Sequence, residues 1–300
     1  MTAPETPAPD PVARLLALLD LDELGDDRFG VANPDRGYGE RVFGGQVAAQ
    51  ALRAAHRTVD VDHAVHSLHA YFLRPGAPGV PITYEVDRIR DGRSFTTRTV
   101  VARQGAEAIF EVSVSFHVAE PGPDYQQPMA GDVPSPADAP NDLGFMPESV
   151  RPMMPMEFKE LGPTEPDEHG WHRSTRRVWM RIKRRLPDDP ALHASLLAFL
   201  SDMGAVMGAR APIAEQPLSR LMGASLDHAM WFHRPMRADE WFLYDLHAVS
   251  NSDSRGLTVG TMHTEAGVLG VSVAQEALLR IIDRPTTASL ADPPPDPATT

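Results

Sequence analysis

The sequence predicts an α+β protein made of two tandem copies of one unit, each an antiparallel sheet packed on a helix. Each half of the chain contains helix-favouring segments followed by several strand-like segments. Short motifs of the first half also recur in the second half at a nearly constant spacing. Self-similarity of this kind is typical of duplicated architectures, so the two observations together indicate the fold class.

The first half begins with an apolar helix and a short strand, followed by a longer helix whose entry is marked by Gly44-Gly45. Its last strand alternates cleanly, with apolar residues on one face and mainly polar residues on the other, as in a half-buried antiparallel strand. The predicted elements are helices at 12–19 and 41–56 and strands at 29–32, 67–73, 82–90, 95–103 and 108–117.

The second half follows a segment rich in Pro, Asp, Gly and Met, whose lack of periodicity indicates a connector. Pro190 opens a helix that continues into an apolar stretch from Leu192, where bulky side chains on every face predict complete burial. The predicted strands lie at 177–182, 224–232, 241–249, 257–262 and 268–279. These patterns divide the chain into a disordered tail (1–11), a first unit (12–118), a connector (119–165), a second unit (166–283) and a second disordered tail (284–300).

Composition excludes several kinds of chemistry. The 300 residues include no cysteine, which excludes thiol nucleophiles, disulfides and thiolate metal sites. The formal net charge of −13 argues against a general nucleic-acid binder. No apolar run reaches membrane-spanning length, and the first residues lack the pattern of a signal peptide. We therefore expect a cytoplasmic protein without membrane insertion.

Three paired positions of the repeat bear on function. They are Gly45 and Asp202 (202 − 45 = 157), Ser67 and Ser225 (225 − 67 = 158), and Phe116 and Gln275 (275 − 116 = 159). The second unit thus replaces a glycine by a carboxylate and a phenylalanine by an amide, while both units keep a hydroxyl. Only the second unit is predicted to hold all three polar groups in its apolar interior.

Buried carboxylates and amides both need hydrogen-bond partners. Asp202, Ser225 and Gln275 could satisfy one another and orient a water molecule from which Asp202 accepts a proton. General-base assistance of this kind contributes roughly 10²- to 10⁴-fold in rate. Two structural alternatives stay open. Ser201 or Asp202 could cap a helix starting at Met203, and the polar side chains could form a network that only fixes how helix and sheet pack.

Several stretches resemble the type II acyl-CoA thioesterases, the TesB group. They include Val42-Phe-Gly-Gly-Gln-Val47, Leu68-His-Ala-Tyr-Phe-Leu-Arg-Pro-Gly76, 90–98, 186–190, Leu200-Ser-Asp202, 226–234 and Gln275-Glu276. The resemblance extends from about Leu15 to Arg280. It implies a double hotdog fold, in which each half wraps an antiparallel sheet around a helix, and it implies hydrolysis of an acyl-CoA thioester to free acid and CoA.

The catalytic residues of that family are an Asp, a Thr or Ser, and a Gln, and by motif position they fall on Asp202, Ser225 and Gln275. Ser225 departs mildly from the many members that carry Thr, but it keeps the hydroxyl. The resemblance implies attack by water without a covalent acyl-enzyme. It also implies acyl-CoA as the substrate, a place in fatty acid metabolism, no cofactor, no metal, and a homo-oligomer.

Two glycines and two arginines are candidates for binding substrate. Gly44 and Gly45 lack side chains and would permit close approach of a ligand between the two units, although tight helix–sheet packing explains them equally well. Backbone amides at this helix start are candidate donors to the oxyanion. Arg93 and Arg255 lie in the corresponding segments 91–94 and 252–256 and complete the set.

Two other functions remain as alternatives. Hotdog enoyl-CoA hydratases carry a motif that Asp188-Asp-Pro-Ala-Leu-His193 resembles, but here the proline is one position early and the asparagine is absent. We interpret this segment as a turn and a helix start. The second alternative is a non-catalytic acyl-CoA-binding protein that keeps its polar groups for packing alone.

Three further features are interpreted as structural. The basic run from Arg173 to Arg185 contains no acidic residue and is expected at a solvated strand and loop edge, rather than on CoA phosphates or nucleic acid. His63, His66 and His69 recur at every third residue, which in a strand places the middle one on the opposite face and disfavours a metal site. Asp227 and His228 could act together as a catalytic base, but adjacent residues of a strand point to opposite faces, which weakens this interpretation.

Overall fold

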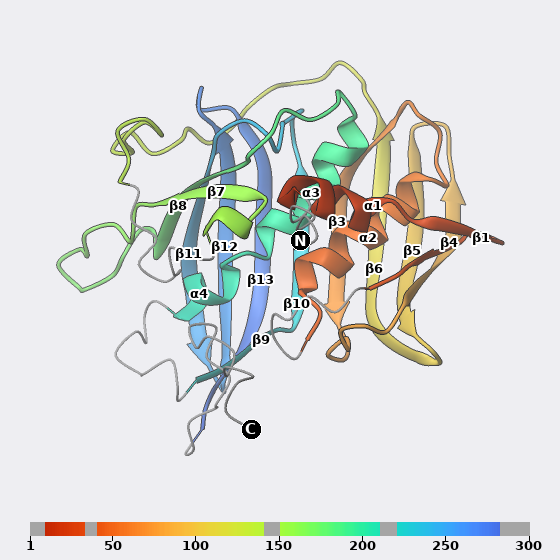
Figure 1. Cartoon of the computed structure of the whole chain (residues 1–300). Coiled ribbons are helices and arrows are strands. Elements are labelled where there is room, and N and C mark those ends of the chain that lie inside the picture. The colour runs from red at the N-terminus through yellow and green to blue at the C-terminus, as the bar shows by residue number, and fades with distance from the viewer. Residues whose placement is uncertain (1–9, 34–40, 141–150, 211–220, 283–300) are drawn as a thin grey trace, which may run out of the picture.

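The computed structural model describes residues 10–33, 41–140, 151–210 and 221–282. Its strands form one continuous sheet of 13 strands, in which paired strands are antiparallel. The strands of the first half lie on one side of Figure 1 and those of the second half on the other, with helices packed between and against them. The predicted α+β class is confirmed, because both halves combine helices with an antiparallel sheet.

The first half contributes the strand order β1-β2-β4-β5-β6-β3. Its longer helix, α2, is rich in alanine and buries ten of its residues, so it packs closely on the sheet. The elements are α1 (Pro11–Leu19), β1 (Asp22–Gly25), β2 (Arg28–Val31), α2 (Gly44–His56), β3 (His63–Phe72), β4 (Ile82–Asp91), β5 (Phe95–Gln104) and β6 (Glu107–Val118).

The second half contributes the order β10-β13-β12-β11-β8-β7, with β9 also paired to β13. Pro190 opens α3 as predicted, and the side chain of Asp189 caps this helix by accepting from the Leu192 N–H at 3.1 Å. The elements are a 3₁₀ turn (Arg151–Met153), β7 (Met156–Glu160), β8 (Arg176–Ile182), α3 (Pro190–Ser201), α4 (Ala205–Arg210), β9 (Leu221–Ser225), β10 (Asp227–Phe232), β11 (Phe242–Ser252), β12 (Arg255–Thr264) and β13 (Leu269–Ile281).

The two halves join through the antiparallel pairing of β3 with β10, the strands at the centre of the sheet. Figure 1 shows β10 standing between β13 of the second half and β3 of the first. In the interior, α2 packs against α3 and against β4, β5 and β6, while α4 lies against β11, β12 and β13. Buried apolar side chains from both halves form one large core cluster, so the halves share a single interior.

The strand register shows which residues of the two halves are equivalent. Tyr84 and Tyr244 are both fully buried on corresponding strands and lie 160 residues apart (244 − 84 = 160). At the same spacing Arg98 corresponds to Thr258 (258 − 98 = 160). Arg98 is paired with Val114 in the sheet, whereas Thr258 is paired with Gln275. The counterpart of Gln275 is therefore Val114, and the sequence-based assignment of Phe116 was wrong.

The register corrects the counterpart of Ser225 in the same way. Ser225 pairs with Ala277 on β13, and the corresponding pair in the first half is Val65 with Phe116. Ser225 thus corresponds to Val65 (225 − 65 = 160) and not to Ser67. The sequence comparison missed this because it matched two serines that lie two residues out of register, and both halves carry the same one-residue irregularity at this point. The hydroxyl is consequently specific to the second half.

Several elements differ from those predicted. β7 lies inside the segment 119–165, predicted to be a connector, and it pairs with β8. Its Met156 and Phe158 are buried in alternation, a signal too short to stand out in the sequence. β1 was not expected, and the strand predicted at 224–232 is divided into β9 and β10. The predicted continuous apolar helix is also interrupted, since α3 ends at Ser201 and α4 begins at Ala205.

The segment 190–210 is more apolar than the sequence analysis allowed. By length and composition it qualifies as a candidate membrane span, but 72% of its most apolar 18-residue window is buried inside the molecule, as expected for a core helix of a folded protein. The tails expected at 1–11 and 284–300 lie outside the described residues, except that Asp10 caps α1 and Pro11 begins it.

The imidazole of His56, which is half-buried between α2 and the sheet, makes the stability of the fold depend on pH. Burial lowers the pKa of His56 from 6.5 to about 4, while its Nδ1–H donates to the Leu52 carbonyl at 2.9 Å. Between those pH values the unfolded chain binds a proton that the folded chain excludes. The contribution of His56 to the free energy of unfolding is therefore constant above pH 6.5. It falls by about 1.4 kcal/mol per pH unit as the pH decreases toward 4, so the folded state becomes less stable.

Denaturant unfolding of the wild type and His56→Leu at several pH values between 7.5 and 4.5 measures this effect. As the pH falls, we expect the variant to become more stable relative to the wild type, because leucine binds no proton in the unfolded chain. A difference that stays constant with pH would contradict the assignment of a neutral buried imidazole.

Candidate active site

Asp202, Ser225 and Gln275, the polar side chains that distinguish the second half, lie together on three different elements. Asp202 follows α3, Ser225 ends β9, and Gln275 lies in the middle of β13. The Ser225 hydroxyl donates to Asp202 Oδ1 at 3.0 Å, and the Gln275 amide donates to Asp202 Oδ1 at 3.1 Å and to Ser225 Oγ at 2.7 Å. Each side chain is therefore in direct hydrogen-bond contact with the other two.

A break between two helices places Asp202 at this position. The chain leaves α3 through Gly204, whose φ of +111° is a conformation that residues with side chains rarely adopt. Arg176 stabilises the break, because its Nη1 donates to the Met203 carbonyl at 3.0 Å and its guanidinium is held by Glu160 of β7 at 2.9 Å. A Cβ at Gly204 would lie 1.6 Å from Arg176 Nη1, so a side chain here would displace the guanidinium in addition to straining the backbone.

The first half supplies a further donor to the same carboxylate. The backbone N–H of Gly45, at the start of α2, donates to Asp202 Oδ2 at 2.8 Å. A Cβ on Gly44 would lie 2.7 Å from the Phe72 ring and 2.8 Å from Asp202 Oδ2, and one on Gly45 would lie 2.5 Å from the Phe199 carbonyl. The two glycines thus let α2 approach Asp202 and α3, and the amide considered as an oxyanion donor is bonded to Asp202.

The cluster is buried and suited to accepting a proton. Gln275 is 1% exposed and Asp202 8% exposed, whereas Ser225 is only partly buried. The three groups that contact the Asp202 carboxylate all donate to it, as an ionised carboxylate requires. Oδ2 accepts one of these bonds and keeps a second acceptor position, which a water molecule could occupy. The side chain of Asp202 is thus part of this cluster and does not cap α4.

Two residues that the sequence analysis did not assign to this cluster, His228 and Ser201, extend it inward. His228 is fully buried, with Nδ1 2.6 Å from Gln275 Oε1 and Nε2 2.7 Å from Ser201 Oγ. Its neighbour Asp227 points to the other side of the strand, where it accepts from the Glu276 N–H at 2.7 Å. The alternation that set this pair aside was correct. His228 shares the buried face of β10 with Met230, and this alternation could have identified it as an inward-facing residue.

The two candidate arginines lie at hairpin ends and are outside this cluster. Arg93 is exposed in the turn between β4 and β5. Arg255 begins β12, where it forms ion pairs with Glu276 at 3.7 Å and Asp253 at 3.8 Å. Neither side chain contacts Asp202, Ser225 or Gln275, so their role in binding substrate stays a prediction.

The basic run from Arg173 to Arg185 is neutralised by acids from other parts of the chain. β7 supplies two of these acids, so the middle of the run is held within the fold, and the exposed residues at its ends are also paired, which leaves little free charge for an anionic ligand. The ion pairs are Arg173 with Asp132, Arg176 with Glu160, Arg181 with Glu157, Arg184 with Asp10, and Arg185 with Glu240.

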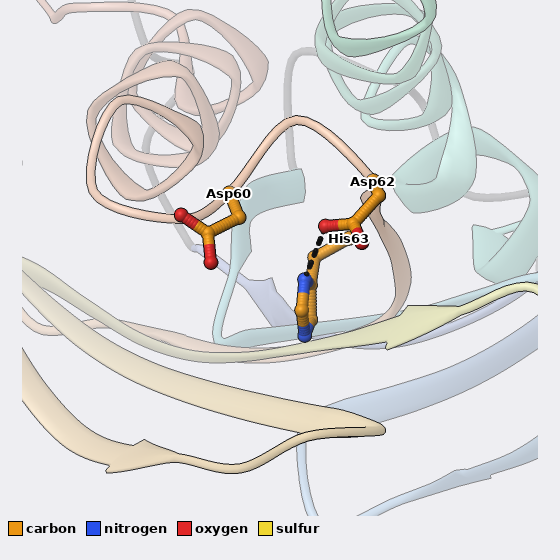
Figure 2. A group of neighbouring side chains, drawn as sticks. All are labelled: Asp60, Asp62 and His63. Carbon is orange, nitrogen blue, oxygen red and sulfur yellow. Dashed lines mark hydrogen bonds and ion pairs between the residues drawn. The ribbon is translucent and has the colours of Figure 1, made fainter.

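Asp60, Asp62 and His63 are the one group of potential metal ligands found among the described residues, with ligand atoms within 4.8 Å of one another (Figure 2). The His63 Nδ1–H donates to Asp62 Oδ1 at 2.9 Å, so this nitrogen has no free lone pair for a metal. Nε2 points away from both carboxylates in Figure 2. The two carboxylates lie in an exposed turn, whereas the imidazole is buried and forms a local hydrogen bond with Asp62.

Two family models match the chain in tandem. The model of the acyl-CoA thioesterase N-terminal domain matches residues 33–117, and that of the acyl-CoA thioesterase C-terminal domain matches residues 130–279. The chain belongs to the acyl-CoA thioesterase family. In this thioesterase the second matched region begins within the segment predicted to be a connector, and it includes β7 and β8 together with all three cluster residues.

Relatives and solved structures agree with this membership. Mouse acyl-coenzyme A thioesterase 8 is 34% identical over 283 residues, which cover 88% of each chain. The crystal structure of acyl-CoA thioesterase II TesB2 from Mycobacterium marinum has a TM-score of 0.77 at 38% identity, covering 90% of this thioesterase and 99% of that chain. A protein of unknown function with a hot dog fold from Alicyclobacillus acidocaldarius has a TM-score of 0.74 at 21% identity, covering 89% and 98%. The predicted double hotdog fold is therefore confirmed.

The close approach at Gly45 predicts that its substitution is costly. In Gly45→Ala the new Cβ would press on the Phe199 carbonyl, so α2 and α3 must separate and the hydrogen bond to Asp202 must lengthen. We expect a loss of roughly 1–3 kcal/mol in the free energy of unfolding, measured by denaturant titration, together with slower hydrolysis of acyl-CoA.

Gly122→Ala is the matched control, because a Cβ added at Gly122 would have no atom within 4 Å and the backbone there is not left-handed. Equal stability of the two variants would show that the contact between α2 and α3 is not tight.

Proposed function

We propose that the protein hydrolyses fatty acyl-CoA to the free fatty acid and CoA at the cluster of Asp202, Ser225 and Gln275. Membership of the acyl-CoA thioesterase family supports the reaction class. The observation that carries the choice of site is the closed ring of hydrogen bonds among the three side chains, in which Asp202 accepts from both of the others.

In the proposed reaction a water molecule donates a hydrogen bond to Asp202 and faces the thioester carbonyl. Asp202 takes one proton as the water oxygen forms a bond to the carbonyl carbon. The resulting tetrahedral intermediate breaks its carbon–sulfur bond, and the CoA thiolate leaves with the proton returned from Asp202. The products are the free acid and CoA, and no residue forms a covalent bond to the acyl group.

Ser225 and Gln275 orient the base in this scheme. Both donate to Asp202 Oδ1, while the N–H of Gly45 donates to Oδ2, so the carboxylate is held in one plane. Ser225 is the most exposed of the three side chains, and its hydroxyl can exchange its bond to Asp202 for one to water. A carboxylate held in this way needs little reorganisation when it accepts the proton.

The hydratase alternative loses support at His193. Its Nδ1 accepts from the Ala238 N–H at 3.2 Å, and its Nε2 donates to the Pro187 carbonyl at 3.1 Å. Asp189 caps α3 at the same place. Both ring nitrogens are thus engaged by the backbone, and the segment is the turn and helix start that the sequence predicted.

Substitution of the cluster tests the proposed site. A thiol-release assay over a series of saturated acyl-CoAs would compare the wild type with Asp202→Asn, Ser225→Ala and Gln275→Ala. We expect Asp202→Asn to lower kcat by about 10²- to 10⁴-fold, because the proton acceptor is lost. The other two variants are expected to lower kcat by smaller factors, because each removes one group that orients it.

Two controls accompany this test. Ser225→Thr keeps the hydroxyl and is expected to retain activity, whereas Ser67→Ala removes a hydroxyl from the first half and is expected to leave kcat unchanged. Wild-type rates in all three cluster variants would refute the site. Consumption of the crotonyl-CoA double bond without thiol release would favour a hydratase, and calorimetric binding of acyl-CoA without turnover would favour a binding protein.

We also propose that the protein forms a homo-oligomer in the cytoplasm. Tyr71 and Trp231 support the oligomer, since they lie on the outer face of the central strands and are 60% and 37% exposed. Large aromatic side chains in such a position are enriched at protein interfaces. Light scattering after gel filtration measures the assembly directly.

A further inference from the structure

A buried chain of hydrogen bonds leads from Asp202 into the core through Gln275, His228 and Ser201. His228 is 0% exposed, and both of its ring nitrogens have a partner. The reaction proposed above uses the Asp202 end of this chain, whereas nothing in it assigns a role to the imidazole.

The donors and acceptors along the chain allow one arrangement of its hydrogens. The amide of Gln275 must direct Nε2 toward Asp202 Oδ1, because the opposite orientation would place Oε1 against the carboxylate. Oε1 then faces His228, so Nδ1 carries the hydrogen and Nε2 is the acceptor. The Ser201 hydroxyl therefore donates to Nε2 at 2.7 Å, in preference to the Ala198 carbonyl at 2.9 Å.

The surroundings of His228 keep this arrangement. Burial lowers the pKa of His228, although the nearby carboxylates of Asp202 and Asp227 act in the opposite direction. The ring is therefore neutral and carries one hydrogen, as the chain requires. Tyr244 supports Ser201 from the other side by donating to its carbonyl at 2.9 Å.

The first half shows that the fold does not need this polar pair. The register places Leu68 opposite Val114 on β3 and β6, where the second half has His228 beside Gln275 (228 − 68 = 160). Leu68 and Val114 are both buried, so a hotdog half packs well with two apolar residues here. The fold therefore does not require an imidazole at this position, and His228 occurs in the half that also has the Gln275 amide.

We propose that His228 is a positioning residue of the thioesterase reaction, which holds the Gln275 amide with its N–H groups toward Asp202 and Ser225. Ser201 donates to the Nε2 acceptor of His228 and so belongs to the same chain of hydrogen bonds. The inference rests on the proposed function, because His228 acts through Gln275 and does not touch the reacting atoms.

His228→Leu tests the inference, since it introduces the residue that occupies this position in the first half. kcat and KM are measured by thiol release with the saturated acyl-CoA that the wild type hydrolyses fastest. We expect kcat to fall by up to about 10²-fold, because an amide free to rotate no longer holds the cluster, while KM changes little. His228→Asn places an N–H near the position of Nδ1 and is expected to recover part of the loss.

Tyr84→Phe is the matched control for a lost buried hydrogen bond, since Tyr84 donates to Gln50 at 2.6 Å in the first half. It is expected to keep kcat while its thermal midpoint falls. The inference is overturned if His228→Leu keeps the wild-type kcat, or if His228→Asn is no faster than His228→Leu at comparable thermal stability.

A double-mutant cycle identifies the residue through which His228 acts. Gln275→Val with His228→Leu rebuilds the apolar pair of the first half and is expected to fold. We expect this double variant to be as slow as Gln275→Val alone, because no amide remains to be oriented. A further loss equal to that caused by His228→Leu in the wild type would overturn the inference.

The same set of variants separates the inference from the proposed function. If Asp202→Asn and Gln275→Val both retain the wild-type rate, the proposed site is wrong. If both lose activity while His228→Leu does not, the site stands and only the role of His228 is refuted.

Discussion

The buried carboxylate of Asp202 is the group on which the rest of the site depends. An ionised group in an apolar interior is very costly unless its oxygens are hydrogen-bonded. Here the donors come from three places: the start of α2, the end of β9 and the middle of β13. The break between α3 and α4 brings the carboxylate to this meeting point, and Gly204 and Arg176 make the break possible. The local backbone conformation at Gly204 and the packing of distant elements together place donors around one carboxylate.

Both halves of the chain contribute to the site. The first half supplies no carboxylate to the cluster, but it supplies the Gly45 N–H and the positive end of the α2 dipole. Its glycine must remain without a side chain, because the Phe199 carbonyl occupies the adjacent space. The second half supplies the remaining groups. Because the two halves share one core and one sheet, the parts of the site cannot move independently.

Much of this organisation could be predicted from the sequence, because alternation and helix signals are local. The strands β4, β5 and β6 and the opening of α3 at Pro190 followed from such patterns. The register between the two halves did not, because a slip of two residues along β6 keeps the same strand face and leaves the alternation unchanged. The repeat thus pointed to Gln275 as a position where the halves differ but matched it to Phe116 in place of Val114. His228 was considered only together with Asp227, because its partners in the fold, Gln275 and Ser201, come from other elements.

The corrected register strengthens the argument from duplication. At the three inward sheet positions the first half has Val65, Leu68 and Val114, all buried and apolar, and the second half has Ser225, His228 and Gln275. A buried amide cannot be introduced alone, since it brings two donor hydrogens and an acceptor that each need a partner. Asp202 and Ser225 take the donors, and His228 satisfies the acceptor. The polar residues of the second half therefore form one mutually required set, in which the loss of any member leaves another unsatisfied in the core.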